Sequence, residues 1–146
     1  MNGERIDTAT ARSYLDSGCT CALYHNETAF CSDKRGVAPL LEWLESGNSF
    51  VGFSAADKVV GKAAAFLYVL LGVCNVYALV ISEAAKKVLR AHGIGVVYEE
   101  KVSAIRNRTN TGFCPMEQAV WGIDDPKTAH SAIIQTLEKL KGKRNK

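Results

Sequence analysis

The longest apolar run in this chain, Ala63–Cys74, constrains the fold more than any other segment. A helix needs about 20 apolar residues to cross a bilayer, so this run is too short to do so. Wound as a helix, it is apolar on nearly every side, which is typical of a helix packed between a sheet and its neighbours. We therefore predict a central buried helix over Ala56–Leu71, ended by Gly72.

Length and composition favour one folded domain over residues 1–146. Hydrophobic residues make up 47% of the 146 residues and charged residues 23%, which is enough apolar material for a core. The net charge of +3 comes from a basic tail over 139–146, because five of the 18 bases follow Glu138 and the remaining 13 face 15 acids. A nucleic-acid protein usually carries a basic stripe across its fold. We therefore expect a solvated tail and no nucleic-acid partner, with a weak polyanion contact as the alternative.

Two features favour a cytoplasmic protein. Met1–Thr10 is polar and carries acids, so no secretory signal is expected at the start of this sequence. The chain has five cysteines, an odd number that suits reduced thiols better than a disulfide framework. We expect a cytoplasmic location and no membrane partner.

Helices and strands are expected to alternate along the chain. A hairpin is predicted where His25-Asn26-Glu27 supplies a turn between two short strands. Later strands joined by short helical crossovers should run parallel. Ser49–Phe53 is either a strand or an extended lead-in. The other predicted elements are a helix from Asp7 or Thr8 to Gly18, strands Thr20–Tyr24 and Thr28–Cys31, helix Val37–Glu45, strand Val76–Ile81, helix Glu83–Ala91 capped by Ser82, strand Val96–Tyr98, and helices from Pro115 to about Trp121 and from Pro126.

This order of elements resembles the cytidine-deaminase fold. Two long segments, Gly52–Ala65 and Asn107–Glu117, resemble a small family of uncharacterised prokaryotic proteins that is classed with the deaminases by structure. The similarity runs from about Ala11 to Leu140. The resemblance implies an α/β fold with three layers, α/β/α, and a mixed sheet in which an antiparallel N-terminal hairpin precedes parallel crossover strands. It implies a fold rather than a reaction.

The residues that make a deaminase are missing where the resemblance places them. A zinc deaminase carries His-x-Glu on the buried helix and Pro-Cys-x-x-Cys on the next. The predicted buried helix starts Asp57-Lys58-Val59, and the next starts Ser82-Glu83-Ala84. Three thiols, Cys19, Cys21 and Cys31, offer an alternative zinc site on the hairpin, although core cysteines are the preferred interpretation. We expect no metal, no cofactor and no zinc-dependent deamination.

The expected start of the buried helix is the first candidate site. Its unpaired amides and positive dipole end suit an anion such as phosphate. Lys58 and Lys62 would lie on one helix face, and Gly61 would let a ligand approach the backbone. Asp57 is a candidate base or a partner for a ribose hydroxyl. Alternatively, Ser54 and Asp57 form a capping-box-like pair that only starts the helix.

The polar segment before Pro115 is the second candidate site. Cys114 is the expected cap of the following helix, where the dipole would lower the pKa of its thiol and make it a candidate nucleophile. Alternatively, Cys114 is a small buried residue and the loop hydrogen-bonds to itself. Arg108 is the expected phosphate clamp. The loop residues expected to contact a ligand are Asn107, Arg108, Thr109, Thr111 and Gly112.

The third candidate pair, Ser82 and Glu83, follows an interior strand, where open α/β sheets gather their ligands. Glu83 is either a catalytic acid or base, or a favourable charge in the first turn of a helix. Together with Asp57 and Cys114, it completes the candidate catalytic set. These features predict metal-independent binding of, or catalysis on, a nucleotide-like or phosphorylated small molecule in a degenerate deaminase pocket. The alternative is a non-catalytic regulatory or scaffold protein, and either is compatible with a homo-oligomer.

Overall fold

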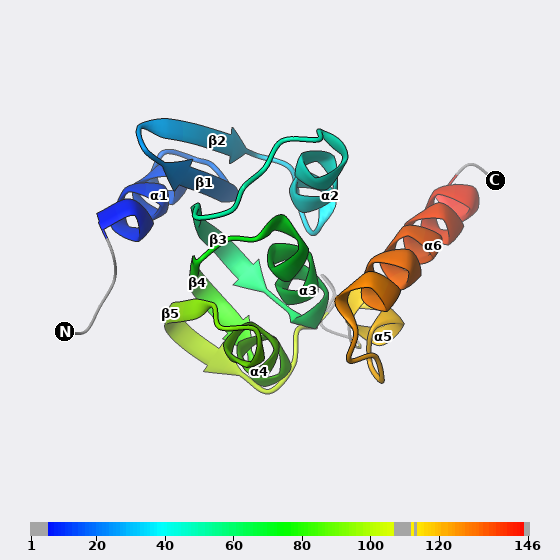
Figure 1. Cartoon of the computed structure of the whole chain (residues 1–146). Coiled ribbons are helices and arrows are strands. Elements are labelled where there is room, and N and C mark those ends of the chain that lie inside the picture. Colours follow the sequence, from blue (N-terminus) through cyan, green and yellow to red (C-terminus); the bar gives the residue numbers. More distant parts are fainter. Residues whose placement is uncertain (1–5, 107–111, 113, 145–146) are drawn as a thin grey trace.

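A computed structural model of the chain describes residues 6–106, 112 and 114–144. Helices flank a five-stranded sheet, and a long C-terminal helix lies beyond them (Figure 1). In chain order the elements are α1 (Ile6–Asp16), β1 (Cys21–His25), β2 (Thr28–Ser32), α2 (Ala38–Glu45), β3 (Ser54–Val60), α3 (Lys62–Leu71), β4 (Asn75–Ser82), α4 (Glu83–Ala91), β5 (Gly95–Val102), α5 (Pro115–Ala119) and α6 (Pro126–Arg144).

The sheet is mixed, with strand order β2-β1-β3-β4-β5. Strand β1 runs antiparallel to both β2 and β3, whereas β3, β4 and β5 are parallel and joined by α3 and α4. The predicted hairpin and parallel crossovers are therefore confirmed. The hairpin turn is tighter than expected, because His25 pairs with Thr28 and only Asn26 and Glu27 connect them, both with positive φ.

The predicted helix over Ala56–Leu71 is wrong in its first part. Ser54–Val60 forms β3, the middle strand of the sheet, and α3 begins only at Lys62. Alanine favours helices, so Ala55 and Ala56 made this segment look helical. The two valines at its end are typical of a strand, and tertiary pairing with β1 and β4 outweighs the local preference.

Small side chains on β3 allow α1 to pack closely on one face of the sheet. Ala11 of α1 and Ala56 of β3 are both fully buried and form a small cluster with Tyr77 of β4. Thr8 of α1 donates a hydrogen bond to Ser54 at 3.1 Å, so the hydroxyl of Ser54 joins helix to strand. Ser54 is therefore not the helix cap that the sequence suggested.

The opposite face of the sheet carries the larger core, centred on α3. Phe66, Leu67 and Tyr68 are essentially fully buried, which confirms a helix that is covered on all sides. Helices α2, α4 and α6 all pack against α3. Gly72 ends α3 in a left-handed conformation with φ of 86°, and its amide donates to the carbonyls of Tyr68 and Val69.

The remaining boundaries differ in detail from those predicted. Ser49–Phe53 belongs to the loop before β3, β5 extends to Val102, and α5 ends at Ala119. Ser82 caps α4 as predicted, with its hydroxyl accepting a hydrogen bond from the Ala85 amide. Among the described helices, none combines the length and apolar character needed to cross a membrane.

Candidate ligand-binding site

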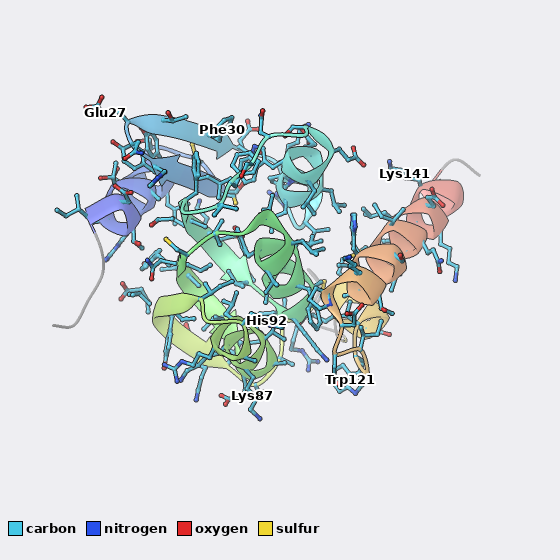
Figure 2. All side chains as sticks on the ribbon, viewed as in Figure 1. Glu27, Phe30, Lys87, His92, Trp121 and Lys141 are labelled. Atoms are coloured by element: carbon cyan, nitrogen blue, oxygen red, sulfur yellow. The ribbon has the colours of Figure 1, made fainter. Side chains whose placement is uncertain are left out.

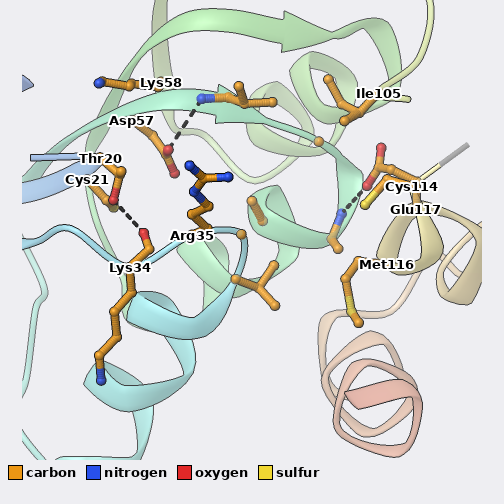
Figure 3. A pocket seen from close by; sticks show the side chains of 16 residues that line it. Thr20, Cys21, Lys34, Arg35, Asp57, Lys58, Ile105, Cys114, Met116 and Glu117 are labelled. Atoms are coloured by element: carbon orange, nitrogen blue, oxygen red, sulfur yellow. Dashed lines mark hydrogen bonds between the residues drawn. The ribbon is translucent and has the colours of Figure 1, made fainter. Parts of the chain in front are cut away.

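A cavity of about 270 Å³ lies at the carboxyl end of β3 and is the main candidate site. It opens between the N-termini of α2 and α3, and α5 closes a third side (Figure 3). We call it the central cavity. Its lining residues are Thr20, Cys21, Lys34, Arg35, Gly36, Val37, Asp57, Lys58, Val59, Gly61, Ala63, Ala64, Ile105, Cys114, Met116 and Glu117.

Asp57 is the buried acid of the central cavity. Its side chain comes from β3, and the residue is only 7% exposed. The hydroxyl of Tyr68, on α3, donates to Asp57 Oδ2 at 2.8 Å. Cys21 Sγ lies 3.0 Å from the same hydroxyl oxygen. Because Tyr68 has a single proton and gives it to Asp57, the Cys21 thiol donates to Tyr68, and the three side chains form a hydrogen-bonded chain.

Burial controls the protonation of this chain. Loss of water raises the pKa of Asp57 from 3.8 to about 7, although hydrogen bonds from Tyr68 and from backbone amides act in the opposite direction. Burial also raises the pKa values of Cys21 and Tyr68, and the nearby Asp57 carboxylate adds to both effects. Near neutral pH, Asp57 is therefore the member of the chain that can either release or accept a proton.

The N-terminus of α3 is occupied by a carboxylate from the chain itself. Glu117 of α5 accepts hydrogen bonds from the backbone amides of Lys62 at 2.8 Å and Ala63 at 2.9 Å. A negative charge is favourable at this position because the helix dipole is positive there. The residue is only 6% exposed, so these two charge-assisted bonds are shielded from water. The sequence predicted an anionic ligand at the start of the buried helix. In the structure, the Glu117 carboxylate of the protein itself binds these amides.

Gly61 makes this arrangement possible. It is the N-cap residue of α3, in an extended conformation that any residue adopts. A Cβ at this position would lie 2.6 Å from the Cδ of Glu117. The missing side chain therefore makes room for the Glu117 carboxylate.

Two basic residues extend the central cavity toward solvent. Arg35, just before α2, reaches into the cavity, whereas Lys58 of β3 points away from Asp57 (Figure 3). Among residues 6–106, 112 and 114–144, neither side chain takes part in an ion pair. Lys34 also lines the cavity, but its Nζ lies 2.6 Å from Glu42. Because Lys58 is on β3 and Lys62 on α3, the two do not share a helix face.

Cys114 lies in the wall of the central cavity, half-buried, as the residue before α5. Its amide donates to the carbonyl of Ile105, and its side chain makes no capping hydrogen bond. The helix that it precedes has only five residues, so its dipole is small. Of the loop residues predicted to bind a ligand, Gly112 forms a half-buried bend. Asn107, Arg108, Thr109 and Thr111 lie outside the described residues.

The other predicted residues line a separate cavity. Lys62, Ser82 and Glu83 face a space of about 300 Å³ on the far side of Glu117, which lines both cavities. Glu83 pairs with Lys101 at 2.8 Å, and this bond lowers the pKa of Glu83. Among the predicted site residues that the structure describes, Ser54 and Gly112 line neither cavity, and the others are divided between the two.

The hairpin cysteines do not converge on one point. Cys21 bonds to Tyr68 in the central cavity, while Cys19 and Cys31 line a different cavity beside α2. Across the described part of the chain, no three His, Cys, Asp or Glu side chains are arranged to hold a metal ion.

Comparison with known proteins assigns the family. The model of a domain of unknown function, DUF1893, matches residues 11–137. The chain belongs to the DUF1893 family. The chain is similar to another DUF1893 protein, TM1506 from Thermotoga maritima, whose crystal structure is known. The two sequences are 25% identical, and the two structures superpose with a TM-score of 0.80 over 94% of this chain and 93% of TM1506. No curated protein matches the sequence.

Three residues of this DUF1893 site were missed by the sequence analysis. Tyr68 and Arg35 carry no local pattern that links them to Asp57, because each comes from a different element. The sequence pointed to Glu117 only in part, because this residue ends the segment Asn107–Glu117 that carries the family resemblance. Its partner Gly61 lies 56 positions earlier, and only the fold brings the two together.

Proposed function

We propose that this protein binds a nucleotide-like or other phosphorylated small molecule in the central cavity, without a metal ion, and that Asp57 exchanges a proton with it. The observation that carries the proposal is the Asp57 carboxyl group. It is buried, it lines a cavity, and its pKa is raised to about 7. Groups with perturbed pKa values in cavities are typical of acid–base sites.

The size and lining of the central cavity support a small ligand with one charged end. A volume of about 270 Å³ suits a single ring system with its substituents. Apolar side chains such as Val37, Val59 and Met116 offer contacts to a ring. Arg35 and Lys58 supply positive charge on the solvent side, where a phosphate would remain partly hydrated.

We also propose that the fold is cytidine-deaminase-like. An antiparallel hairpin, parallel crossover strands and helices on both faces of the sheet support this relationship. The two helices that start at the central cavity begin Val37-Ala38-Pro39 and Gly61-Lys62-Ala63. These starts replace Asp57 and Ser82, with which the sequence analysis compared the deaminase signature, because Asp57 lies on β3. Neither start contains the His, Glu or Cys residues of that signature, which supports chemistry without zinc. A cytoplasmic location remains our proposal from the cysteine content.

A thermal-shift panel tests ligand binding. Nucleoside monophosphates, nucleosides and sugar phosphates are added to the wild-type chain and to Arg35→Ala, with Arg90→Ala on α4 as the matched control. A ligand that binds only the folded state raises Tm. We expect a phosphorylated compound to raise Tm for wild type and Arg90→Ala, and to lose most of its effect with Arg35→Ala. No response to any compound would contradict the proposal and favour a non-catalytic scaffold.

The pH dependence of binding tests the role of Asp57. If Asp57 exchanges a proton with the ligand, the Kd of the compound found above changes between pH 6 and 8. Asn cannot titrate at position 57, so Asp57→Asn should keep only the pH dependence that comes from the ligand phosphate, whose second pKa is about 6, and should lose the additional change seen with wild type. Equal pH profiles for the two proteins would rule out proton exchange by Asp57 while leaving the binding site intact.

A further inference from the structure

The second cavity, on the far side of Glu117, has the features of a binding site in its own right. It lies where β4 and β5 end, which is where ligands of open α/β sheets gather. Its volume of about 300 Å³ is close to that of the central cavity. We call it the β4–β5 cavity, and its lining residues are Lys62, Ser82, Glu83, Ala84, Lys87, Ser103, Ala104, Glu117 and Trp121.

Trp121 gives this cavity an aromatic wall. It follows α5 and is 61% exposed. Among the large hydrophobic residues exposed on the described part of the chain, Trp121 is the one with an aromatic ring. Its backbone carbonyl accepts a hydrogen bond from Lys62 Nζ at 3.2 Å, which ties the segment to the start of α3. Figure 2 shows Trp121 at the outer edge of the molecule, below α5 and α6. A flat indole face at a cavity is a stacking surface for a planar ring.

Two lysines and two glutamates line the β4–β5 cavity, and Lys101 and Lys86 beside Glu83 add positive charge around it. Its two acids are already engaged: Glu83 pairs with Lys101, and Glu117 binds the amides at the start of α3. Positive charge from Lys86 and Lys87 further lowers the pKa of Glu83. Among the described residues, Lys87 takes part in no ion pair, and the Lys62 ammonium has donors beyond the one given to Trp121. An anionic group is therefore the ligand that this wall favours.

We infer that the β4–β5 cavity is a second binding site, in which a nucleobase stacks on Trp121 and its phosphate pairs with Lys87 and Lys62. An aromatic face and two ammonium groups that line one cavity match the two parts of a nucleoside monophosphate, because every base has a flat π-face and the phosphate is a dianion. The inference goes beyond the proposed function, since Glu117 separates this cavity from Asp57 and Arg35.

Trp121 also provides the readout. The chain has two tryptophans, so Trp43→Phe leaves Trp121 as the only one. We expect AMP to change the fluorescence of this variant in a saturable way, and adenosine or ribose 5-phosphate alone to bind more weakly. Equilibrium dialysis with AMP on the otherwise wild-type chain then compares Trp121→Phe, which keeps a stacking face, with Trp121→Ala, which should weaken binding about tenfold or more.

Lysine variants locate the phosphate. Lys87→Ala should weaken AMP binding several-fold, and Lys139→Ala, a matched change at an exposed position of α6 outside both cavities, should not. An unchanged fluorescence signal at millimolar AMP would overturn the inference. So would AMP binding that survives Trp121→Ala and Lys87→Ala but is lost with Arg35→Ala, a result that would instead support the central cavity. An AMP affinity lost with Lys87→Ala and kept with Arg35→Ala would support the second site alone.

Discussion

Gly61 lies directly against the carboxylate of Glu117, and a Cβ at position 61 would approach the Glu117 carboxylate oxygens to 2.6 and 2.7 Å. The same carboxylate holds the amides of Lys62 and Ala63. The position of Glu117 therefore explains why residue 61 is a glycine. Glu117 also caps the central helix and separates the two cavities. A change at either residue should be felt at the other.

Gly61→Ala should destabilise the fold by about 1–3 kcal/mol. The added methyl group displaces the Glu117 carboxylate, and the two amides at the start of α3 lose their acceptor. Urea unfolding measures the change. Gly122→Ala is the matched control, because a Cβ at Gly122 meets no atom within 4 Å and should change stability by less than about 0.5 kcal/mol. An equal effect at both glycines would disprove the close contact.

Glu117→Ala should cost about 2–3 kcal/mol, because two charge-assisted hydrogen bonds are lost at the positive end of a helix. In this background, Gly61→Ala should no longer be harmful, since the group that it displaces is gone. A double-mutant cycle therefore predicts strong coupling between the two positions. Additive effects would show that the carboxylate does not contact Gly61. Glu100→Gln, at an exposed position of β5, controls for loss of one negative charge.

Asp57 should make the fold less stable as the pH rises from about 4 to about 7. Its pKa of about 7 in the folded state exceeds the unfolded value of about 3.9, so the folded state holds the extra proton in that range. The stabilisation is complete below the unfolded pKa and is lost as the pH passes the folded pKa. A difference of about three pH units corresponds to about 4 kcal/mol. Above pH 7 the contribution levels off.

The unfolding free energy of wild type minus that of Asp57→Asn isolates the contribution of Asp57 protonation to stability. It should fall with pH between 4 and 7 and then become constant. Asp125→Asn is a useful control, because hydrogen bonds from Thr128 lower the pKa of Asp125 and its contribution is lost only as the pH falls. A difference curve for Asp57→Asn that rises with pH would mean that the carboxyl group is stabilised in its charged form.

Tyr68→Phe should raise the pKa of Asp57 further. The Tyr68 hydroxyl donates to the carboxylate and favours its charged form, so its removal leaves burial less opposed. Titration of the Asp57 carboxyl carbon by NMR measures the change directly. Tyr98→Phe removes a hydroxyl that bonds to Lys86, away from the central cavity, and should leave the Asp57 titration unchanged. A lower Asp57 pKa in Tyr68→Phe would contradict the hydrogen-bonded chain.

Much of the fold was predictable from local sequence. The hairpin, the cap at Ser82, the parallel strands and the all-round burial of α3 follow from turn residues, capping chemistry and apolar runs, each of which depends on neighbours in the chain. The strand over Ser54–Val60 was missed because its alanines prefer a helix in isolation. Pairing on both edges and the close approach of α1 reverse that preference.

The sequence by itself determined which residues are available for chemistry, and three of those that it singled out, Asp57, Gly61 and Cys114, line the central cavity. Only the tertiary structure decided their partners. Tyr68 reaches Asp57 across 11 positions and Glu117 reaches Lys62 across 55, and no local pattern encodes such pairs. The physical reason is that burial and hydrogen bonding, which set the protonation of Asp57 and fill the helix end, depend on distances between elements rather than on spacing along the chain.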